Sequence, residues 1–187
     1  IIKTQIKSRG EKQLNTGKRS GQIMEEELKK LKIRRPDDLA DICKIEVVED
    51  KASFKLCDTA KKNLPQIADN QLLFFNKGLV SVKHKPLKVG ILFSGGPASG
   101  GHNIIAGLYD ALKEMNPQSS VIGFMNGPDG LLKADGRVLS AEDINGIRNQ
   151  GGFYLLGTSR TKFEKNEDLD KCVETIKKFD LDGLLIT

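Results

Sequence analysis

Four glycines within seven residues form the stretch of this chain best suited to chemistry. Gly95, Gly96, Gly100 and Gly101 lie between a short apolar segment and an amphipathic one. Glycine permits φ angles above zero and lets a ligand approach peptide N–H groups closely. A helix start adds unpaired N–H groups and the positive end of the helix dipole. The loop is therefore expected to bind an anion, and phosphate is the expected one. The alternative is a tight strand-to-helix turn in which the glycines serve packing alone.

The spacing of these glycines excludes the two commonest phosphate-binding loops. A P-loop reads GxxxxGK[ST], and counting from Gly96 puts its second glycine at Gly101. His102 and Asn103 then stand where the lysine and the hydroxyl residue should be. The dinucleotide fingerprint GxGxxG also fails, because the order here is GGxxxGG.

Arg160 is the strongest side-chain candidate for work on phosphate. A guanidinium can span two phosphate groups bidentately and can stabilise charge during phosphoryl transfer. Gly151, Gly152 and Gly157 precede it, which indicates a shaped loop, although a surface arginine is the alternative. Lys162 is equally well explained as a solvated loop charge.

The other polar residues in these segments have structural explanations. His102 and Asn103 fall in the first turn of the expected helix, where either could contact a phosphate but also cap the helix or steady the loop. We favour the structural role for both. Asp129 and Asp135 are expected to be turn residues, because neither has a neighbouring carboxylate that would suggest an acid/base pair.

Three segments of the chain are similar to a known family in sequence, order and separation. They read GILFSGGPASGGHNIIAG (90–107), GFMNGPDGLL (123–132) and NQGGFYLLGTSRTKF (149–163). Together they resemble the phosphofructokinases, specifically the long, pyrophosphate-dependent branch. ATP-dependent members usually carry aspartate after the glycine pair and lack GGHN, so Pro97 and the run from Gly100 to Asn103 favour that branch. Ser99 departs from the pattern, which has proline there, and some loop rigidity is lost.

The resemblance implies a glycolytic phosphotransferase that phosphorylates fructose 6-phosphate, with pyrophosphate in preference to ATP, and that forms homo- or hetero-oligomers. Magnesium is implied as well, held by an aspartate of a GGDD motif, with the base in a later TIDGD-type segment. Neither motif occurs here, so the catalytic and metal-binding residues are expected beyond Thr187 and residues 1–187 alone are expected to be inactive. The implied phosphoryl-donor site consists of Gly95, Gly96, Gly100, Gly101, Arg160 and Thr161.

Two other functions stay open. The first is a non-catalytic, regulatory phosphofructokinase-like subunit or half. The second is a phosphate-ligand binding module that never transfers phosphate. The motifs after Thr187 would separate them, because intact GGDD and TIDGD aspartates favour the enzyme.

Alternating apolar and amphipathic segments beyond Pro86 predict the elements that position these residues. The expected fold is α/β, a Rossmann-like parallel sheet flanked by helices, over 86–187. NGPDGLL is expected to be a loop at the carboxyl end of a strand. The expected strands are 88–93, 119–125, 137–139 and 182–187, and the expected helices are 102–115, 141–149 with Ser140 as N-cap, and 167–179. Their inward stripes are expected to be Ile104, Ile105, Leu108 and Leu112 in the first helix and Leu169, Val173 and Ile176 in the last.

Residues 1–85 are expected to form an irregular N-terminal extension. It should begin with a mobile basic arm, 1–21, followed by a helix over 22–32. A short helix near Leu39 and Ile42 should lead into strand 44–48, paired with 52–56. A helix over 59–63, N-capped by Asp58, and a buried strand or docking segment over 72–75 complete the extension.

Composition excludes several classes of function. Residues 1–35 hold eleven Lys or Arg and four Glu, so the formal charge of +5 belongs to the arm and not to the α/β part. The arm has no aromatic residue, and we expect no nucleic-acid partner. There is no run of eighteen apolar residues and no charged-then-apolar leader, so we expect no membrane partner and a cytoplasmic location. Three cysteines without a CxxC pair indicate reduced thiols.

Overall fold

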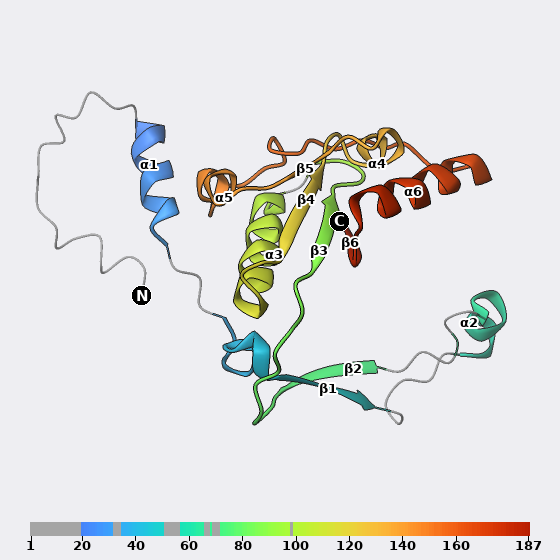
Figure 1. Ribbon diagram of the computed structural model, residues 1–187, viewed down its shortest axis with the longest axis horizontal. Helices are drawn as coiled ribbons and strands as arrows, with labels where there is room; N and C mark the ends of the chain where they lie inside the picture. The colour runs from blue at the N-terminus through green and yellow to red at the C-terminus, as the bar shows by residue number, and fades with distance from the viewer. Residues whose placement is uncertain (1–19, 32–34, 51–56, 66–67, 69–71, 98) are drawn as a thin grey trace, which may run out of the picture.

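A four-stranded sheet with helices on both faces forms the centre of the protein (Figure 1). The structure is a computed structural model and describes residues 20–31, 35–50, 57–65, 68, 72–97 and 99–187. Its strands are β3 (Lys88–Leu92), β4 (Ser120–Phe124), β5 (Gly136–Val138) and β6 (Gly183–Ile186). The order is β5-β4-β3-β6, with β3 parallel to both β4 and β6. The predicted α/β class is confirmed.

The edge strand β5 differs from the parallel sheet that the sequence predicts, because it runs antiparallel to β4. The connection between them holds only the short helix α4 (Pro128–Lys133) and a turn in which the Met125 N–H donates to the Asp135 carbonyl. A parallel partner needs a crossover of a dozen or more residues. The chain therefore turns back and pairs antiparallel.

The central strands are buried on both faces. Ile91 and Phe93 pack on one side, with α3 (Gly101–Met115) and α5 (Ala141–Ile147), while Leu92 packs on the other with α4 and α6 (Asn166–Phe179). Successive side chains of a strand point to opposite faces, so a continuous apolar run serves both layers. Full burial of each such side chain stabilises the fold by roughly 1.5–3 kcal/mol.

Most predicted elements after residue 86 are confirmed, with bounds that shift by one or two residues. The N-cap of α5 is also confirmed: the Ser140 hydroxyl accepts the Asp143 N–H, and the Asp143 carboxylate accepts the Ser140 N–H. NGPDGLL is not wholly a loop, because Pro128–Lys133 forms α4. Proline in the first turn favours a helix start, since its missing N–H would be unpaired there anyway.

Two predicted inward stripes need correction. Ile104 is 43% exposed, although Ile105 and Leu112 are buried as predicted. In α6, Leu169 and Val173 are about half exposed, at 51% and 47%. The face of α6 toward the sheet instead carries buried Cys172 and Thr175 and half-buried Ile176 and Phe179. These positions follow the helical repeat of three to four residues. Of the predicted stripe in α6, Ile176 belongs to this face, and Leu169 and Val173 do not.

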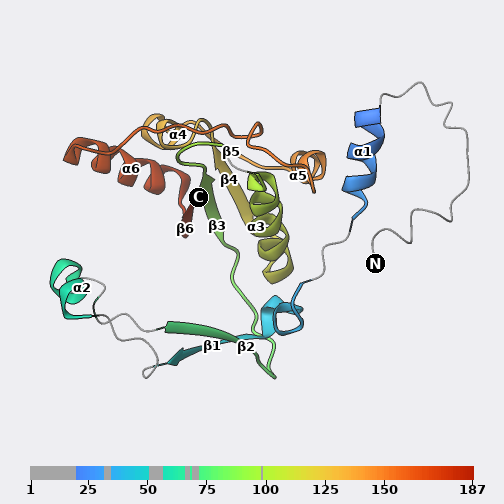
Figure 2. The ribbon, with the colours of Figure 1, turned by 180° about the vertical axis from the view of Figure 1, so that it is seen from behind.

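The N-terminal part forms separate small elements. They are α1 (Ser20–Lys29), two short 3-10 helices (Asp37–Leu39 and Ile42–Lys44), β1 (Ile45–Asp50), α2 (Asp58–Asn63) and β2 (Leu72–Lys77). The predicted arm lies outside the described residues up to position 19. Strand β1 pairs antiparallel with β2, and the predicted partner, 52–56, lies outside the described residues. Both views show this ribbon apart from the main sheet (Figure 1, Figure 2).

Two further predictions in this part are wrong. Cys57 occupies the N-cap of α2, and Asp58 is the first helical residue. Residues 72–75 do form part of a strand, β2, but Phe74 and Phe75 are about half exposed, because no third layer covers the ribbon among the described residues. The predicted burial is wrong, and the alternative of a docking segment stays a prediction. No described helix has both the length and the apolar character needed to cross a membrane.

Candidate phosphate-binding site

Two segments far apart in the sequence meet at the carboxyl end of β3. Ser159 forms a parallel bridge with Ser94, and its carbonyl accepts the Gly95 N–H at 2.9 Å. The Thr158 hydroxyl lies 3.0 Å from the Phe93 carbonyl and 2.9 Å from the Gly95 carbonyl. In open α/β sheets, ligands bind outside the carboxyl ends of the strands. The glycine loop and the segment that carries Arg160 therefore form one candidate site.

The Arg160 side chain lies over the glycine loop. A Cβ atom built on Gly96 would be 3.1 Å from one Arg160 Nη atom and would contact nothing else within 4 Å. Arg160 is exposed, and among the described residues no carboxylate or carbonyl pairs with its guanidinium. The structure thus brings together two residues that the sequence predicts separately, and the guanidinium keeps its donors for a ligand.

The four glycines have different structural roles. Gly95 (φ 99°) and Gly100 (φ 92°) adopt left-handed conformations that favour glycine. The Gly95 N–H is already donated to Ser159, so Gly95 shapes the turn and has no free donor in this structure. Gly101 is buried, and a Cβ there would lie 2.9 Å from the Gly152 carbonyl oxygen. The backbone N–H groups of Gly96, Gly100 and Gly101 have no acceptor among the described residues.

His102 and Asn103 hold the loop that leads to Arg160. The buried His102 ring accepts the Leu155 N–H through Nε2 at 3.2 Å, which assigns the ring proton to Nδ1. Burial lowers the pKa of His102, an effect that the Gln150 backbone carbonyl partly opposes, and Nδ1 makes no hydrogen bond of normal geometry. The Asn103 side-chain oxygen accepts the Asn149 N–H at 3.0 Å. These contacts support the structural roles predicted for both residues.

Thr161 and Asp129 form a contact that the sequence did not reveal. The Thr161 hydroxyl donates to Asp129 Oδ1 at 2.6 Å. Asp129 lies in the first turn of helix α4, so its prediction as a turn residue is wrong. The two residues are 32 positions apart, and no local pattern links them. The only available signal was that Asp129 follows a strand expected to end at the same sheet edge. Asp135 is exposed, and its side chain makes no hydrogen bond among the described residues, as a turn residue should.

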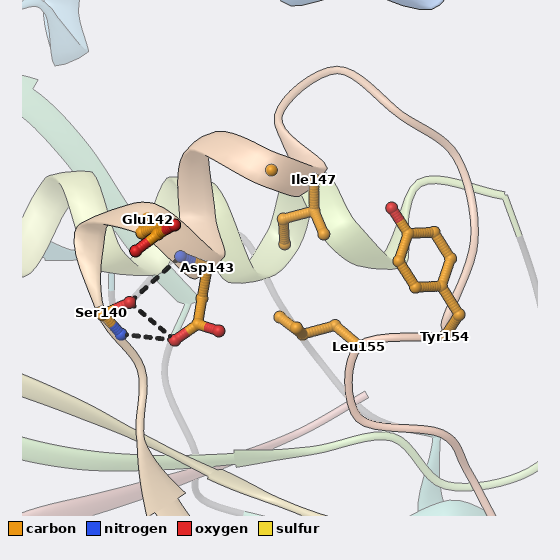
Figure 3. Close-up of a pocket in the computed structure, with 7 residues that line it drawn as sticks. Ser140, Glu142, Asp143, Ile147, Tyr154 and Leu155 are labelled. Carbon is orange, nitrogen blue, oxygen red and sulfur yellow. Dashed lines mark hydrogen bonds between the residues drawn. The ribbon is translucent and has the colours of Figure 1, made fainter.

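A hollow of about 320 Å³ lies elsewhere, between α5 and Tyr154–Leu155 (Figure 3). It contains the carboxylates of Glu142 and Asp143 and no basic side chain. The Asp143 carboxylate pairs bidentately with Arg137 and accepts a hydrogen bond from the Ser140 N–H. These contacts hold the pKa of its carboxyl well below the usual range. This hollow is therefore unsuited to a phosphate.

Comparison with known proteins identifies the family. The chain is 38% identical over 144 residues to the pyrophosphate–fructose 6-phosphate 1-phosphotransferase of Porphyromonas gingivalis, covering 76% of this chain and 26% of that protein. It is 46% identical over 100 residues to subunit beta 1 of the Arabidopsis thaliana enzyme of that name, covering 54% and 18%. The chain thus spans about a quarter or less of the length of these relatives. Among solved structures, Pichia pastoris phosphofructokinase in the T-state has a TM-score of 0.45 at 22% identity, over 58% of this chain and 12% of that one. Residues 88–187 match the sequence model described as Phosphofructokinase, and the chain belongs to that family.

Proposed function

We propose that the intact protein is a pyrophosphate-dependent 6-phosphofructokinase, with ATP as the less favoured donor. It would transfer a phosphoryl group to the 1-hydroxyl of fructose 6-phosphate. The observation that carries this proposal is the Arg160 guanidinium, unpaired among the described residues, over Gly96 at the carboxyl edge of the sheet. The choice of pyrophosphate is supported by the names of the two relatives above.

The residues of this chain would bind and polarise the phosphoryl donor. The N–H groups of Gly96, Gly100 and Gly101, the last at the first position of α3, would face its phosphate oxygens, since they have no acceptor among the described residues. Arg160 would span two of those oxygens and stabilise the charge that moves during transfer. Phosphoryl transfer depends mainly on such positioning and charge stabilisation, so these contacts are suited to the reaction.

Magnesium is part of the proposal but not of the steps assigned to this chain. A metal ion bridging donor oxygens would offset charge in the reaction. The described residues contain no group of three or more His, Cys, Asp or Glu that could hold a metal ion. The described residues therefore do not form a metal site by themselves, and we propose that the magnesium ligands lie outside them.

The test is a coupled assay of the purified full-length protein with fructose 6-phosphate and either pyrophosphate or ATP. Turnover with pyrophosphate is expected. Consumption of neither donor would overturn the enzyme proposal, and tight pyrophosphate binding without turnover would favour the binding module. Residues 1–187 alone are expected to show no turnover, because no base for the sugar hydroxyl is assigned within them.

Oligomerisation and a cytoplasmic location complete the proposal. One relative is named as a subunit, beta 1, of the Arabidopsis thaliana enzyme, which supports an oligomer for the intact protein. Size-exclusion chromatography with light scattering of the full-length protein would test the assembly. A strictly monomeric enzyme would remove this part of the proposal and leave the reaction unaffected.

A further inference from the structure

The segment that carries Arg160 is held at points on both sides of that residue. Before it, Thr158 and Ser159 bond to Phe93 and Gly95 at the end of β3. After it, the Thr161 hydroxyl donates to Asp129 Oδ1, in the first turn of α4 at the end of β4. Among the described residues, Lys162, Phe163 and Glu164, which follow, make no hydrogen bond before α6 begins at Asn166. The hydrogen bond to Asp129 therefore holds the far end of the segment, together with Phe163, which packs against the core cluster that contains Leu92.

The direction of the side chains explains why this contact matters for Arg160. Alternate residues of an extended segment point to opposite sides. The Ser159 and Thr161 hydroxyls lie 3.4 Å apart, on one side of the segment, and Thr161 reaches Asp129 there. Arg160, between them, is directed to the other side, where it lies over Gly96. A rotation of the backbone at Thr161 would therefore swing Arg160 away from the glycine loop.

The charge of Asp129 gives a second argument. A carboxylate close to a phosphate site repels the ligand, and a carboxylate that paired with Arg160 would compete with it. Asp129 does not compete in this way: its carboxylate accepts a hydrogen bond from the Thr161 hydroxyl, and no ion pair joins it to the Arg160 guanidinium. The carboxylate thus orders the segment while the positive charge of Arg160 stays free for the donor.

We propose that Asp129 is a positioning residue that fixes Arg160 over the phosphoryl-donor site through Thr161. The inference rests on the proposed function, because the donor that Arg160 meets is pyrophosphate. It assigns to the contact between Asp129 and Thr161 a role in donor affinity, distinct from a general role in folding.

The test uses the full-length protein with the substitutions Asp129→Ala and Asp129→Asn. Asp129→Ala removes the acceptor and should raise the KM for pyrophosphate about tenfold, the effect of losing one charge-assisted hydrogen bond. Asp129→Asn keeps an acceptor oxygen and should recover most of the affinity. Thr161→Val should match Asp129→Ala, and Thr161→Ser, which keeps the hydroxyl, should recover most of the affinity. Asp135→Ala removes an exposed carboxylate from the next turn and is the control without effect.

A coupling experiment separates positioning from a merely structural role. In an Arg160→Ala background, Asp129→Ala should cause no further loss of pyrophosphate affinity, because the group that it positions is absent. Independent, additive losses would overturn the inference, as would an unchanged pyrophosphate KM in both Asp129→Ala and Thr161→Val. Thermal unfolding of each variant, and the KM for fructose 6-phosphate, should change little.

Failure of the proposed function can be told apart from failure of this inference. If the wild type turns over pyrophosphate and the variants behave like it, only the inference fails. If the wild type shows no turnover, pyrophosphate affinity is measured by calorimetry and the same coupling is expected in the dissociation constant. If the wild type does not bind pyrophosphate at all, both the proposed function and the inference are overturned.

Discussion

Replacing Gly96 by valine tests the contact on which the proposed function depends. A Cβ atom at Gly96 would lie 3.1 Å from an Arg160 Nη atom and meet nothing else within 4 Å, and Gly96 does not have a positive φ. The substitution therefore disturbs one flexible side chain and leaves the backbone unstrained. The γ-methyl groups of valine reach roughly 1.5 Å further than Cβ, so the guanidinium has to leave its place over the loop. Losing one charge-assisted contact costs about 1.5–3 kcal/mol, which is roughly 10- to 150-fold in the dissociation constant for pyrophosphate.

The assay is isothermal titration calorimetry of pyrophosphate with full-length Gly96→Val, accompanied by circular dichroism and thermal unfolding. Gly107→Val is the control, because Gly107 is exposed on α3 and its Cβ would meet nothing within 4 Å. If Gly96→Val acts only by displacing Arg160, the loss of pyrophosphate affinity that it causes should be smaller in an Arg160→Ala background. An equal loss of pyrophosphate affinity in that background would mean that the valine side chain also obstructs the phosphate. Binding as tight as that of the wild type would refute the phosphate-loop reasoning.

Substitutions of Arg160, His102 and Gly127 test the surroundings of this contact. Arg160→Ala should weaken pyrophosphate binding by about 1.5–3 kcal/mol, and Arg160→Lys should restore only part of it because an ammonium lacks the bidentate fork. Lys162→Ala is the control, and unchanged kinetics in Arg160→Ala would return this arginine to the surface-residue interpretation. Burial lowers the pKa of His102, so the unfolded chain binds a proton first as the pH falls below about 6.5. The wild type should therefore lose thermal stability between about pH 7 and pH 5 more steeply than His102→Gln, and equal slopes would contradict this. Gly127→Ala should destabilise the protein by more than about 2 kcal/mol, because the φ of Gly127 is 63° and a Cβ there would collide with the Phe93 carbonyl. An unchanged melting temperature would show that the segments around Gly127 and Phe93 can move apart.

The parts of the fold that the sequence predicts best are set by local pattern. The strand, glycine loop and helix around Gly95 to Gly101 follow one another directly, and each has its own signal: an apolar run, turn residues and a helical repeat. The N-cap at Ser140 is equally local, because Asp143 lies three residues away. Such features need no knowledge of what the segment packs against.

The features that the sequence does not predict depend on distant partners. The apolar pattern of α6 predicted that Leu169 and Val173 face inward, but the buried residues of this helix are Cys172 and Thr175, which are weakly apolar and give little periodic signal. Strand β1 pairs with β2 across a gap in sequence that no local rule bridges. The contact between Asp129 and Thr161 has the same origin, since only the sheet topology brings the ends of β3 and β4 together.

The position of Arg160 follows from three elements acting on one short segment. Helix α3 holds the preceding loop through His102 and Leu155, the end of β3 holds Thr158, and the end of β4 holds Thr161. A long, exposed side chain normally loses up to about 2 kcal/mol of rotamer entropy when a ligand orders it. Here the backbone beneath Arg160 is already ordered by these bonds, so a bound donor has to order the side chain alone. An exposed arginine on a loop can in this way act as a pre-organised phosphate contact, because the order resides in the segment that carries it.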